Sequence, residues 1–275
     1  MALRRNAFTY GVAIPFAIVL AFPFVWMFIT SLKPEAQVYD PTKTWRFHPT
    51  LASYGYLFHH TDYVRWLENS FFVGLLVVLI TLVVALPAGY ALARLAGGVG
   101  RSLGVGIFLT YLVPPTLLFL PLSRVVAQYL HLSDRLWSLI VVYPSFTIPF
   151  AIWLLMGFFK TIPQELEDAA LVDGCGRFGS LVRVVFPISL PLQLPIAIVA
   201  VLFGIVFTAT DMVVPYILTN GGPFNSTQMI TTYAFTTGIN AGNIGEGAAI
   251  ALFLLPVLAV VAVGMLVFAR RAEVT

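Results

Sequence analysis

Long uncharged stretches set the pattern of this chain. Seven runs of 20 or more residues contain no charged side chain, namely 6–32, 69–93, 102–123, 136–159, 184–210, 212–245 and 247–269. About 20 helical residues cross a hydrocarbon layer roughly 30 Å thick. Each run is therefore long enough to form a membrane-spanning helix.

The 212–245 run differs from the other six in composition. It is rich in Gly, Asn and Thr, as in Thr219-Asn220-Gly221-Gly222-Pro223 and Asn225-Ser226-Thr227. A helix of this composition would leave many polar groups in lipid. We therefore expect a loop at the membrane face here and an all-α membrane protein with six transmembrane helices elsewhere.

The composition supports a membrane protein and excludes two other classes. Of the 275 residues, 59% are hydrophobic and only 10% are charged, whereas soluble domains carry about 25% charged residues. A disordered chain needs low hydrophobicity and high net charge. The single cysteine, Cys175, excludes an intrachain disulfide, and no Cys/His cluster has the spacing of a metal site.

The distribution of Lys and Arg predicts the orientation, because these residues favour the cytoplasmic side. Six crossings place nine of them on the side of both termini and six on the other side. We expect both termini to be cytoplasmic. The first run has 27 residues, longer than the roughly 7–15 of a signal-peptide core, so we interpret it as a retained span.

The six predicted spans contain no Asp, Glu, Lys, Arg or His. Ion-driven carriers usually need ionisable groups inside the membrane, and an enzyme would need a nucleophile with a base or a metal. The chain also lacks GxxxxGK[ST], the loop that cradles nucleotide phosphates. It therefore has no ATPase site of its own, and any energy for transport must come from a partner.

The 160–187 loop has features of a short helix. Thr161 and Gln164 have the spacing of a capping box, and Pro163 fits the first turn. Glu165, Glu167 and Asp168 follow, where acids favour the helix dipole. Gly174 is a typical helix end. These signals predict a helix over 161–174.

This helix is expected to present a shallow apolar face. Ile162, Leu166, Ala169 and Ala170 share that face, and acids flank it. One alternative is a helix lying in the lipid headgroups, but acids are disfavoured beside an anionic leaflet. A groove on a partner protein fits the helix better. A second apolar stripe is formed by Phe178, Leu181, Val182 and Val185.

The loop resembles the EAA loop in membrane subunits of binding-protein-dependent ABC importers. That pattern is Glu-Ala-Ala, three residues, Gly, nine residues, Ile, one residue, Leu-Pro. Ala169, Ala170, Gly174 and Pro187 match it, while Asp168, Val184 and Phe186 replace its Glu, Ile and Leu. The resemblance implies that this loop contacts the ATPase subunits.

Other segments resemble the second permease subunit of the carbohydrate uptake group, similar to a maltose permease subunit. They are Ser31-Leu32-Lys33-Pro34-Glu35, Asn69-Ser70, residues 88–94 and residues 162–167. Leu218 to Pro223 resembles the partner permease equally well. The resemblance implies a type I ABC importer permease fold in a prokaryotic inner membrane. It also implies three kinds of partner: a second permease subunit, two cytoplasmic ATPases that bind ATP and Mg, and an extracytoplasmic solute-binding protein.

The resemblance also assigns roles to residues. Ala169 and Ala170 would allow close approach, Gly174 would make the turn, and Glu167, Asp168 and Asp173 would be polar anchors. The full set of expected ATPase-coupling residues is Glu165, Leu166, Glu167, Asp168, Ala169, Ala170, Asp173, Gly174, Arg177 and Pro187. No cofactor is expected on this chain itself.

Two further sets of candidates concern the solute and its binding protein. Polar residues of the spans can hydrogen-bond a sugar or, alternatively, another helix; the candidates for the path are Tyr111, Tyr143, Thr208, Thr210 and Asp211. The polar loop is expected to reach toward the binding protein through Asn220, Gly221, Gly222 and Asn225.

We expect one permease domain over 1–275. Residues 1–68 would form the first span and an outer loop, and 69–269 a five-span core that contains the 160–187 loop. The main alternative is an ion-coupled secondary carrier, and another is a membrane scaffold without transport activity. An ABC importer permease for a polyamine, phosphate or an amino acid also stays open.

Overall fold

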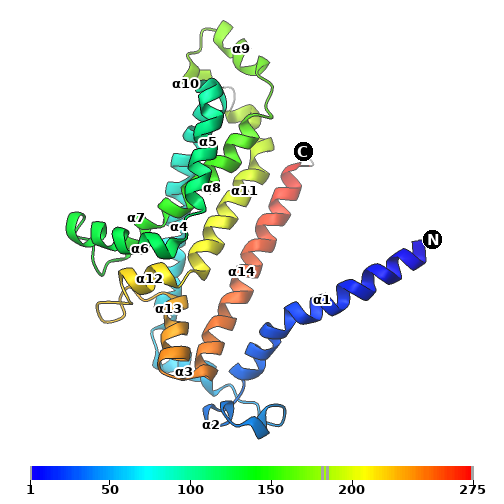
Figure 1. The fold of residues 1–275 in the computed structure, drawn as a ribbon, viewed down its shortest axis with the longest axis vertical. Helices are drawn as coiled ribbons and strands as arrows, with labels where there is room; N and C mark the ends of the chain where they lie inside the picture. Colours follow the sequence, from blue (N-terminus) through cyan, green and yellow to red (C-terminus); the bar gives the residue numbers. More distant parts are fainter. Residues whose placement is uncertain (1, 181–182, 184–185, 274–275) are drawn as a thin grey trace. The chain divides into compact units, whose positions relative to one another are not determined.

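The computed structural model describes residues 2–180, 183 and 186–273. Every regular element in these ranges is a helix (Figure 1). The chain divides into two compact units, one of residues 1–65 with 230–256 and the other of residues 66–229 with 257–275. Each unit is described by itself.

The first unit contains a long N-terminal helix and several short elements. They are α1 (Ala2–Ser31), α2 (Glu35–Val38), η1 (Pro41–Lys43), α3 (Ala52–His60), the start of α4 (Tyr63–Tyr90), α13 (Ile230–Phe235), η5 (Thr236–Asn240) and the first part of α14 (Ile244–Glu273). The apolar side chains of α1 are largely exposed, as in Phe16 and Val19. A helix of this kind is suited to lipid rather than to water.

Polar contacts tie the segment after α1 to the start of α14. The buried ammonium of Lys33 lies 5.5 Å from the ring centre of Trp26 and 5.3 Å from that of Phe47. Two residues on, a carboxylate oxygen of Glu35 accepts a hydrogen bond of 3.2 Å from the backbone N–H of Gly245. This acid satisfies one of the unpaired N–H groups that every helix start leaves.

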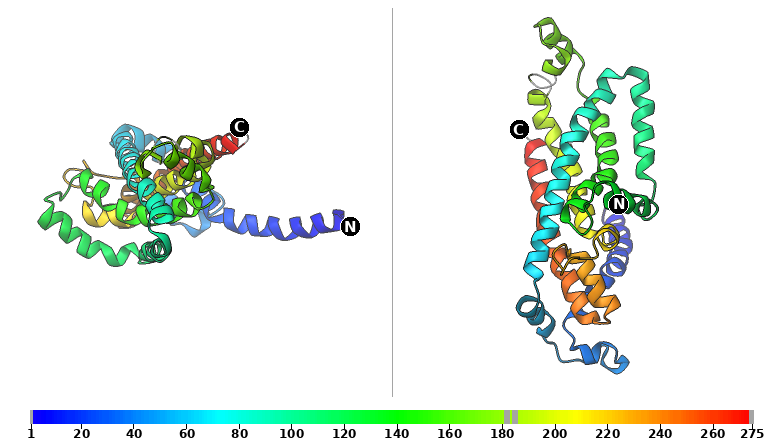
Figure 2. Two further views of the ribbon diagram at one scale, coloured as in Figure 1. Left: turned by 90° about the horizontal axis from the view of Figure 1, so that it is seen from above. Right: turned by 90° about the vertical axis from the view of Figure 1, so that its left-hand side faces the viewer.

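The second unit holds the remaining helices. They are the rest of α4, η2 (Ala91–Leu95), α5 (Gly97–Tyr111), α6 (Pro115–Arg124), η3 (Val125–Tyr129), α7 (Leu136–Val142), α8 (Pro144–Phe159), α9 (Glu165–Val172), α10 (Arg177–Ser180), α11 (Phe186–Thr210), α12 (Val213–Leu218) and the end of α14. The elements η2, η3 and η5 are π-helical. In two views the axes of α4, α5, α8 and α11 are roughly parallel (Figures 1 and 2).

Two apolar clusters form the core of this unit. One is built around Val77, Leu139 and Tyr143, and the other around Tyr90, Leu155 and Phe159. Between α4 and α8 the hydroxyls of Thr81 and Thr147 form a buried hydrogen bond of 2.6 Å. Such a bond joins two helices where lipid offers no competing partner.

Four of the predicted spans coincide with long apolar helices among the described residues: Ala13–Ser31, Tyr63–Leu95, Leu136–Phe159 and Ile244–Phe268. The described residues of the run 184–210 form α11 (Phe186–Thr210), and its part Ala197–Thr210 is a shorter apolar helix. The fold class is confirmed as all-helical, while the number of crossings and the side of the termini stay predictions.

The run 102–123 does not form one continuous helix, and whether it crosses the membrane stays a prediction. The chain forms α5 and then α6 with η3, and the two parts are bent by 88° (Figure 1). The bend falls at Pro114 and Pro115, and Pro114 has an extended ψ of 132°. Proline has no N–H to donate, and it disfavours helical geometry in the residue before it.

The expectation of a loop throughout 212–245 is also wrong. Helices α12, α13 and η5 lie in it, and its irregular residues are 212, 219–229 and 241–243. The short helices bury apolar side chains, including Val214 and Ile230. Its Gly and Asn residues gather in 219–229 and around the end of η5, whereas the apolar residues between them form helices because they can be buried.

We expect Gly247→Ala to destabilise the fold. A Cβ on Gly247 would lie 2.5 Å from the Cα of Gly238, a backbone atom of η5. Overpacking of this kind costs about 1–3 kcal/mol. The measurement is thermal unfolding of the purified protein in detergent, followed by intrinsic fluorescence.

Gly264→Ala, in the same helix, is the matched control, since nothing lies within 4 Å of its added Cβ. It should be neutral or stabilise by about 0.5–1 kcal/mol. Equal melting temperatures for the two variants would contradict the close contact at Gly247.

Candidate functional site

Helix α9 ends as its sequence predicts. Gly174 has a φ of +84°, in the left-handed region that favours glycine. Its N–H donates to the carbonyl of Leu171 at 3.1 Å, and the N–H of Cys175 donates to the carbonyl of Ala170 at 3.0 Å. This pair of bonds is a Schellman motif, so the expected role of Gly174 as the turn after the helix is confirmed.

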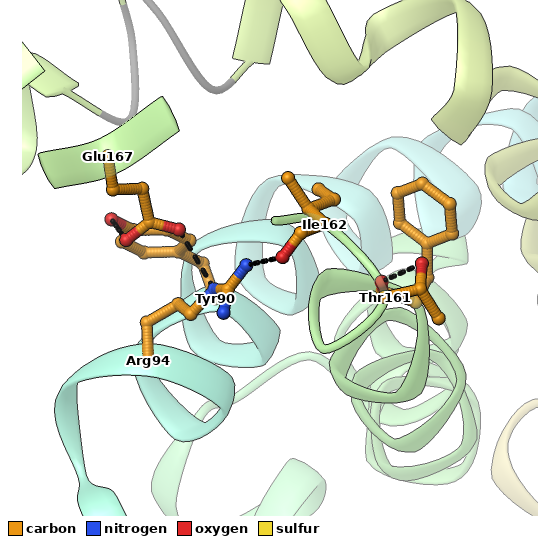
Figure 3. A network of polar contacts seen from close by, with 6 residues as sticks. Tyr90, Arg94, Thr161, Ile162 and Glu167 are labelled. Carbon is orange, nitrogen blue, oxygen red and sulfur yellow. Dashed lines mark hydrogen bonds and ion pairs between the residues drawn. The ribbon is translucent and has the colours of Figure 1, made fainter. Parts of the chain in front are cut away.

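The predicted start of this helix is wrong. α9 begins at Glu165, and Gln164 makes no capping bond with its side chain. The hydroxyl of Thr161 instead donates 2.8 Å backward to the carbonyl of Phe158 (Figure 3). Carbonyls at the end of α8 lack helical partners, and Thr161 satisfies one of them rather than opening α9.

A network of three side chains joins α9 to the end of α4 (Figure 3). A carboxylate oxygen of Glu167 lies 2.8 Å from Nε of Arg94. The hydroxyl of Tyr90 donates to the other oxygen of Glu167 at 3.1 Å, and Nη2 of Arg94 donates to the carbonyl of Ile162. The Arg94 and Glu167 side chains are each 11% exposed. At such burial an ion pair is only weakly screened by water.

The predicted apolar face of the helix is only partly buried against the chain. Ile162 and Ala170 are buried, and Leu166 packs against the cluster of Tyr90 and Phe159. Ala169 is exposed instead. A helical wheel shows which residues are neighbours, but it does not show which side meets the rest of the chain.

The outward side of α9 combines acids with apolar surface. The exposed residues of α9 are Glu165, Asp168, Ala169, Leu171 and Val172, of which Val172 is 88% exposed, and Asp173 directly after the helix is exposed as well. Glu167, expected as a polar anchor toward a partner, is bonded within its own chain. Pro187 is exposed, and the side chain of Arg177 lies outside the described residues.

The candidates for a solute path are bonded within the chain. The hydroxyl of buried Tyr143 donates to Asp211 at 3.0 Å. Asp211 also accepts from the N–H groups of Val213 at 3.3 Å and Val214 at 3.0 Å. It therefore caps α12. Burial raises the pKa of the Asp211 carboxyl above its usual value, while these donors act to lower it.

The three other candidates also have local partners. Thr208 is buried and donates to the carbonyl of Gly204 at 2.9 Å, and Thr210 donates to that of Val206 at 2.7 Å. The ring of Tyr111 packs 5.9 Å from that of Phe203. The structure joins Tyr143 to Asp211, and a solute contact by these residues stays a prediction.

The 219–229 loop exposes Phe224 and is held by hydrogen bonds from α4. Asn220 and Asn225 have φ values of 45° and 59°, Gly221 has 77°, and Phe224 between them is fully exposed. The side-chain amide of Asn69 donates to the carbonyls of Ser226 at 3.0 Å and Gln228 at 3.1 Å. Trp66 donates to the carbonyl of Asn225 at 3.2 Å. Two residues of α4 therefore hold the loop.

Comparison with known proteins decides the family. Residues 85–274 match the family described as "Binding-protein-dependent transport system inner membrane component". The chain belongs to this family. It is thus a multi-pass inner-membrane component of a binding-protein-dependent transport system, as the EAA-like loop suggests.

Curated relatives of this family member include two named for sugar derivatives. The sulfoquinovosyl glycerol transport system permease protein of Agrobacterium fabrum is 37% identical over 171 residues, 62% of this chain and 60% of that protein. The diacetylchitobiose uptake system permease protein of Streptomyces coelicolor is 28% identical over 250 residues, 90% of this chain and 87% of that protein.

A solved structure shows the same fold. It belongs to a bacterial ABC transporter involved in the import of the acidic polysaccharide alginate, with a TM-score of 0.69 and 20% identity. The match covers 96% of each chain. The ABC importer permease fold is therefore confirmed.

Three residues of this family member were not singled out as site residues from the sequence. Tyr90 and Arg94 lie in the segment that closes the second span, and nothing near them in the sequence indicates the contact with Glu167. Phe224 lies between predicted loop residues. Its signal is its position, since a large apolar residue among Gly, Pro and Asn has no neighbour in the sequence to pack against.

We expect Asn69→Ala to loosen the 219–229 loop. The change removes both amide bonds to the loop, and loss of a hydrogen-bond partner to a buried group costs about 1–3 kcal/mol. Amide hydrogen exchange of residues 219–229 should become about tenfold faster, since 1.4 kcal/mol corresponds to a factor of ten.

The neighbouring exposed residue supplies the control, Glu68→Ala. It should leave exchange in the loop unchanged. The proposed anchoring fails if Asn69→Ala also leaves loop exchange at the rate of the unsubstituted protein.

Proposed function

We propose that this chain is a permease subunit of an ATP-driven importer for a sugar or oligosaccharide, coupled to its ATPases through α9. The observation that carries the proposal is the outward side of α9. Asp168, Ala169 and Val172 stand exposed on a short helix whose opposite side is fixed to the chain. Such a helix suits a groove on a partner protein.

The chemistry of this side suits a protein partner. Val172 offers exposed apolar area, Ala169 allows close approach, and Asp168, Asp173 and Glu165 supply charge around them. Partly apolar surface with a charged rim is the common arrangement of protein interfaces. In this proposal the groove belongs to a cytoplasmic ATPase, which binds ATP and Mg, and Arg177 and Pro187 extend the contact.

The proposed topology has six crossings with both termini in the cytoplasm. It places α9 on the side that holds nine of the 15 Lys and Arg residues. It also places the 219–229 loop on the opposite side. We propose that Asn220, Gly221, Gly222 and Asn225 contact the solute-binding protein there, with Phe224 at the tip, and that a second permease subunit completes the pore.

The sugar class rests on the relatives, which are named for sulfoquinovosyl glycerol and diacetylchitobiose transport. Tyr111, Tyr143, Thr208, Thr210 and Asp211 offer hydroxyl, carboxyl and aromatic groups that suit a sugar. An ion-coupled carrier is disfavoured, because the six predicted spans carry no charged residue in the sequence. A polyamine, phosphate or an amino acid is the competing solute class.

Deletion of the coding region, followed by growth tests, examines the solute class. We expect the deletion strain to lose growth on one of diacetylchitobiose, maltotriose or galactobiose as sole carbon source. Loss of uptake of a polyamine, phosphate or an amino acid, with sugar use intact, would contradict the proposed class.

Restoring the gene with Gly174→Val tests the coupling role. The β-branched residue is strained at a φ of +84°, by about 1–2 kcal/mol or more. We expect the variant to insert at normal levels but to restore uptake at least about tenfold less well, a loss equivalent to 1.4 kcal/mol.

Gly176→Val is the matched control, two residues further on, where nothing lies within 4 Å of an added Cβ and φ is not positive. It should restore uptake fully. Full uptake with Gly174→Val would overturn the role of this turn in coupling.

A further inference from the structure

Two adjacent acids of α9 have opposite surroundings. The carboxylate of Glu167 is buried and bonded to Arg94 and Tyr90, whereas Asp168 is exposed. The resemblance to the EAA loop concerns the position of Asp168. Glu167 therefore needs a separate explanation, and its bonds point to the chain's own α4.

Arg94 holds two separate points near α9. Its Nε faces the carboxylate of Glu167 on the helix, and its Nη2 bonds the carbonyl of Ile162 in the segment that leads into the helix. Arg94 itself lies in η2, the π-helical continuation of α4. One guanidinium thus links both the helix and its entry segment to one end of a predicted span.

Tyr90 adds a third link one helical turn earlier. Its hydroxyl bonds the second carboxylate oxygen of Glu167, so each oxygen of this acid has a partner from α4 or η2. The Tyr90 ring is 3% exposed and packs edge-on against Phe159 at 5.6 Å. Packing of the ring fixes the hydroxyl, and the hydroxyl in turn fixes the orientation of the carboxylate.

Apolar packing holds only one part of α9, through Leu166 and Ala170. A cavity of about 110 Å³ adjoins the network, and its lining residues are Tyr90, Arg94, Leu95, Gln164, Glu167, Asp168, Leu171 and Ser180. A cavity gives the helix no van der Waals support where it lies. Beside the cavity, the hydrogen bond from Tyr90 and the ion pair with Arg94 hold Glu167, and with it α9.

We infer that Tyr90, Arg94 and Glu167 form a strut that makes α9 and α4 move as one rigid body. The inference rests on the proposed function, in which an ATPase displaces α9. These three are positioning residues, because in the inference they act through the place and orientation of α9. A displacement of α9 is therefore transmitted to α4 by the strut. Without the strut it would be transmitted through residues 160–164, which join α9 to α8.

A distance measurement tests the strut in the assembled transporter. One spin label goes on Cys175, the only cysteine of the chain, just after α9, and the other on Val83→Cys, an exposed position of α4. The chain is purified with its partner permease and ATPases, whose own cysteines are replaced. Pulsed EPR then compares the nucleotide-free complex with the complex trapped by ATP and vanadate.

We expect a single label-to-label distance that changes by less than about 2 Å between the two states, within the range of small interface shifts. Glu167→Gln, which removes the charge and keeps the size, should broaden the distribution at least about twofold in the trapped state. Tyr90→Phe, which removes only one donor, should broaden it less. Glu68→Gln, an exposed acid of α4, should match the unsubstituted chain.

Two results would overturn the strut. One is a label-to-label distance in the unsubstituted chain that changes by well above 2 Å between the two states. This result does not depend on whether any variant folds. The other is a Glu167→Gln distribution that equals the unsubstituted one in both states. Failure of the proposed function would look different, because the chain would then not purify with ATPases or trap nucleotide with vanadate.

Discussion

Hydrocarbon offers no hydrogen-bond partner to a peptide group, and this constraint governs the whole chain. Each backbone N–H and C=O inside the membrane must be satisfied within its own segment, which leaves helices as the available structure. Where prolines remove donors, as at Pro114 and Pro115, the helix breaks and the chain turns by 88°. The same constraint favours polar side chains at the ends of helices, where backbone N–H and C=O groups lack partners within the helix.

Three of these polar side chains give the second unit its specific form. Asn69 holds the 219–229 loop, Asp211 caps α12, and Glu167 holds α9 through Arg94 and Tyr90. Each joins an irregular or short segment to a long helix or its continuation. Apolar packing alone cannot do this, because it has little directional preference. The segments that we propose as partner contacts are thus positioned by a small number of buried polar bonds.

Much of the architecture was predictable from the sequence, because the lipid exposure of an uncharged run and the turn at a glycine after a helix depend on neighbouring residues alone. The all-helical class and the turn at Gly174 are of this kind. The bend at Pro114 had a local signal in its two adjacent prolines, yet span length alone missed it. The hydroxyl of Thr161 can bond the start of α9 or the end of α8, and the local sequence does not show that it bonds the end of α8. The Glu167–Arg94 pair joins residues far apart in the sequence, which no local pattern reports.

The central claim is that the outward side of α9 contacts an ATPase. The most direct test places a photo-crosslinking amino acid at Ala169 in the native host and identifies the adduct by mass spectrometry. The same amino acid at Val260, an exposed residue of α14, serves as the control. We expect the label at Ala169 to form an adduct with a protein that carries a nucleotide-binding P-loop. The label at Val260 should form no such adduct. Adducts at Ala169 with lipid alone, or with a protein that lacks this loop, would contradict the central claim.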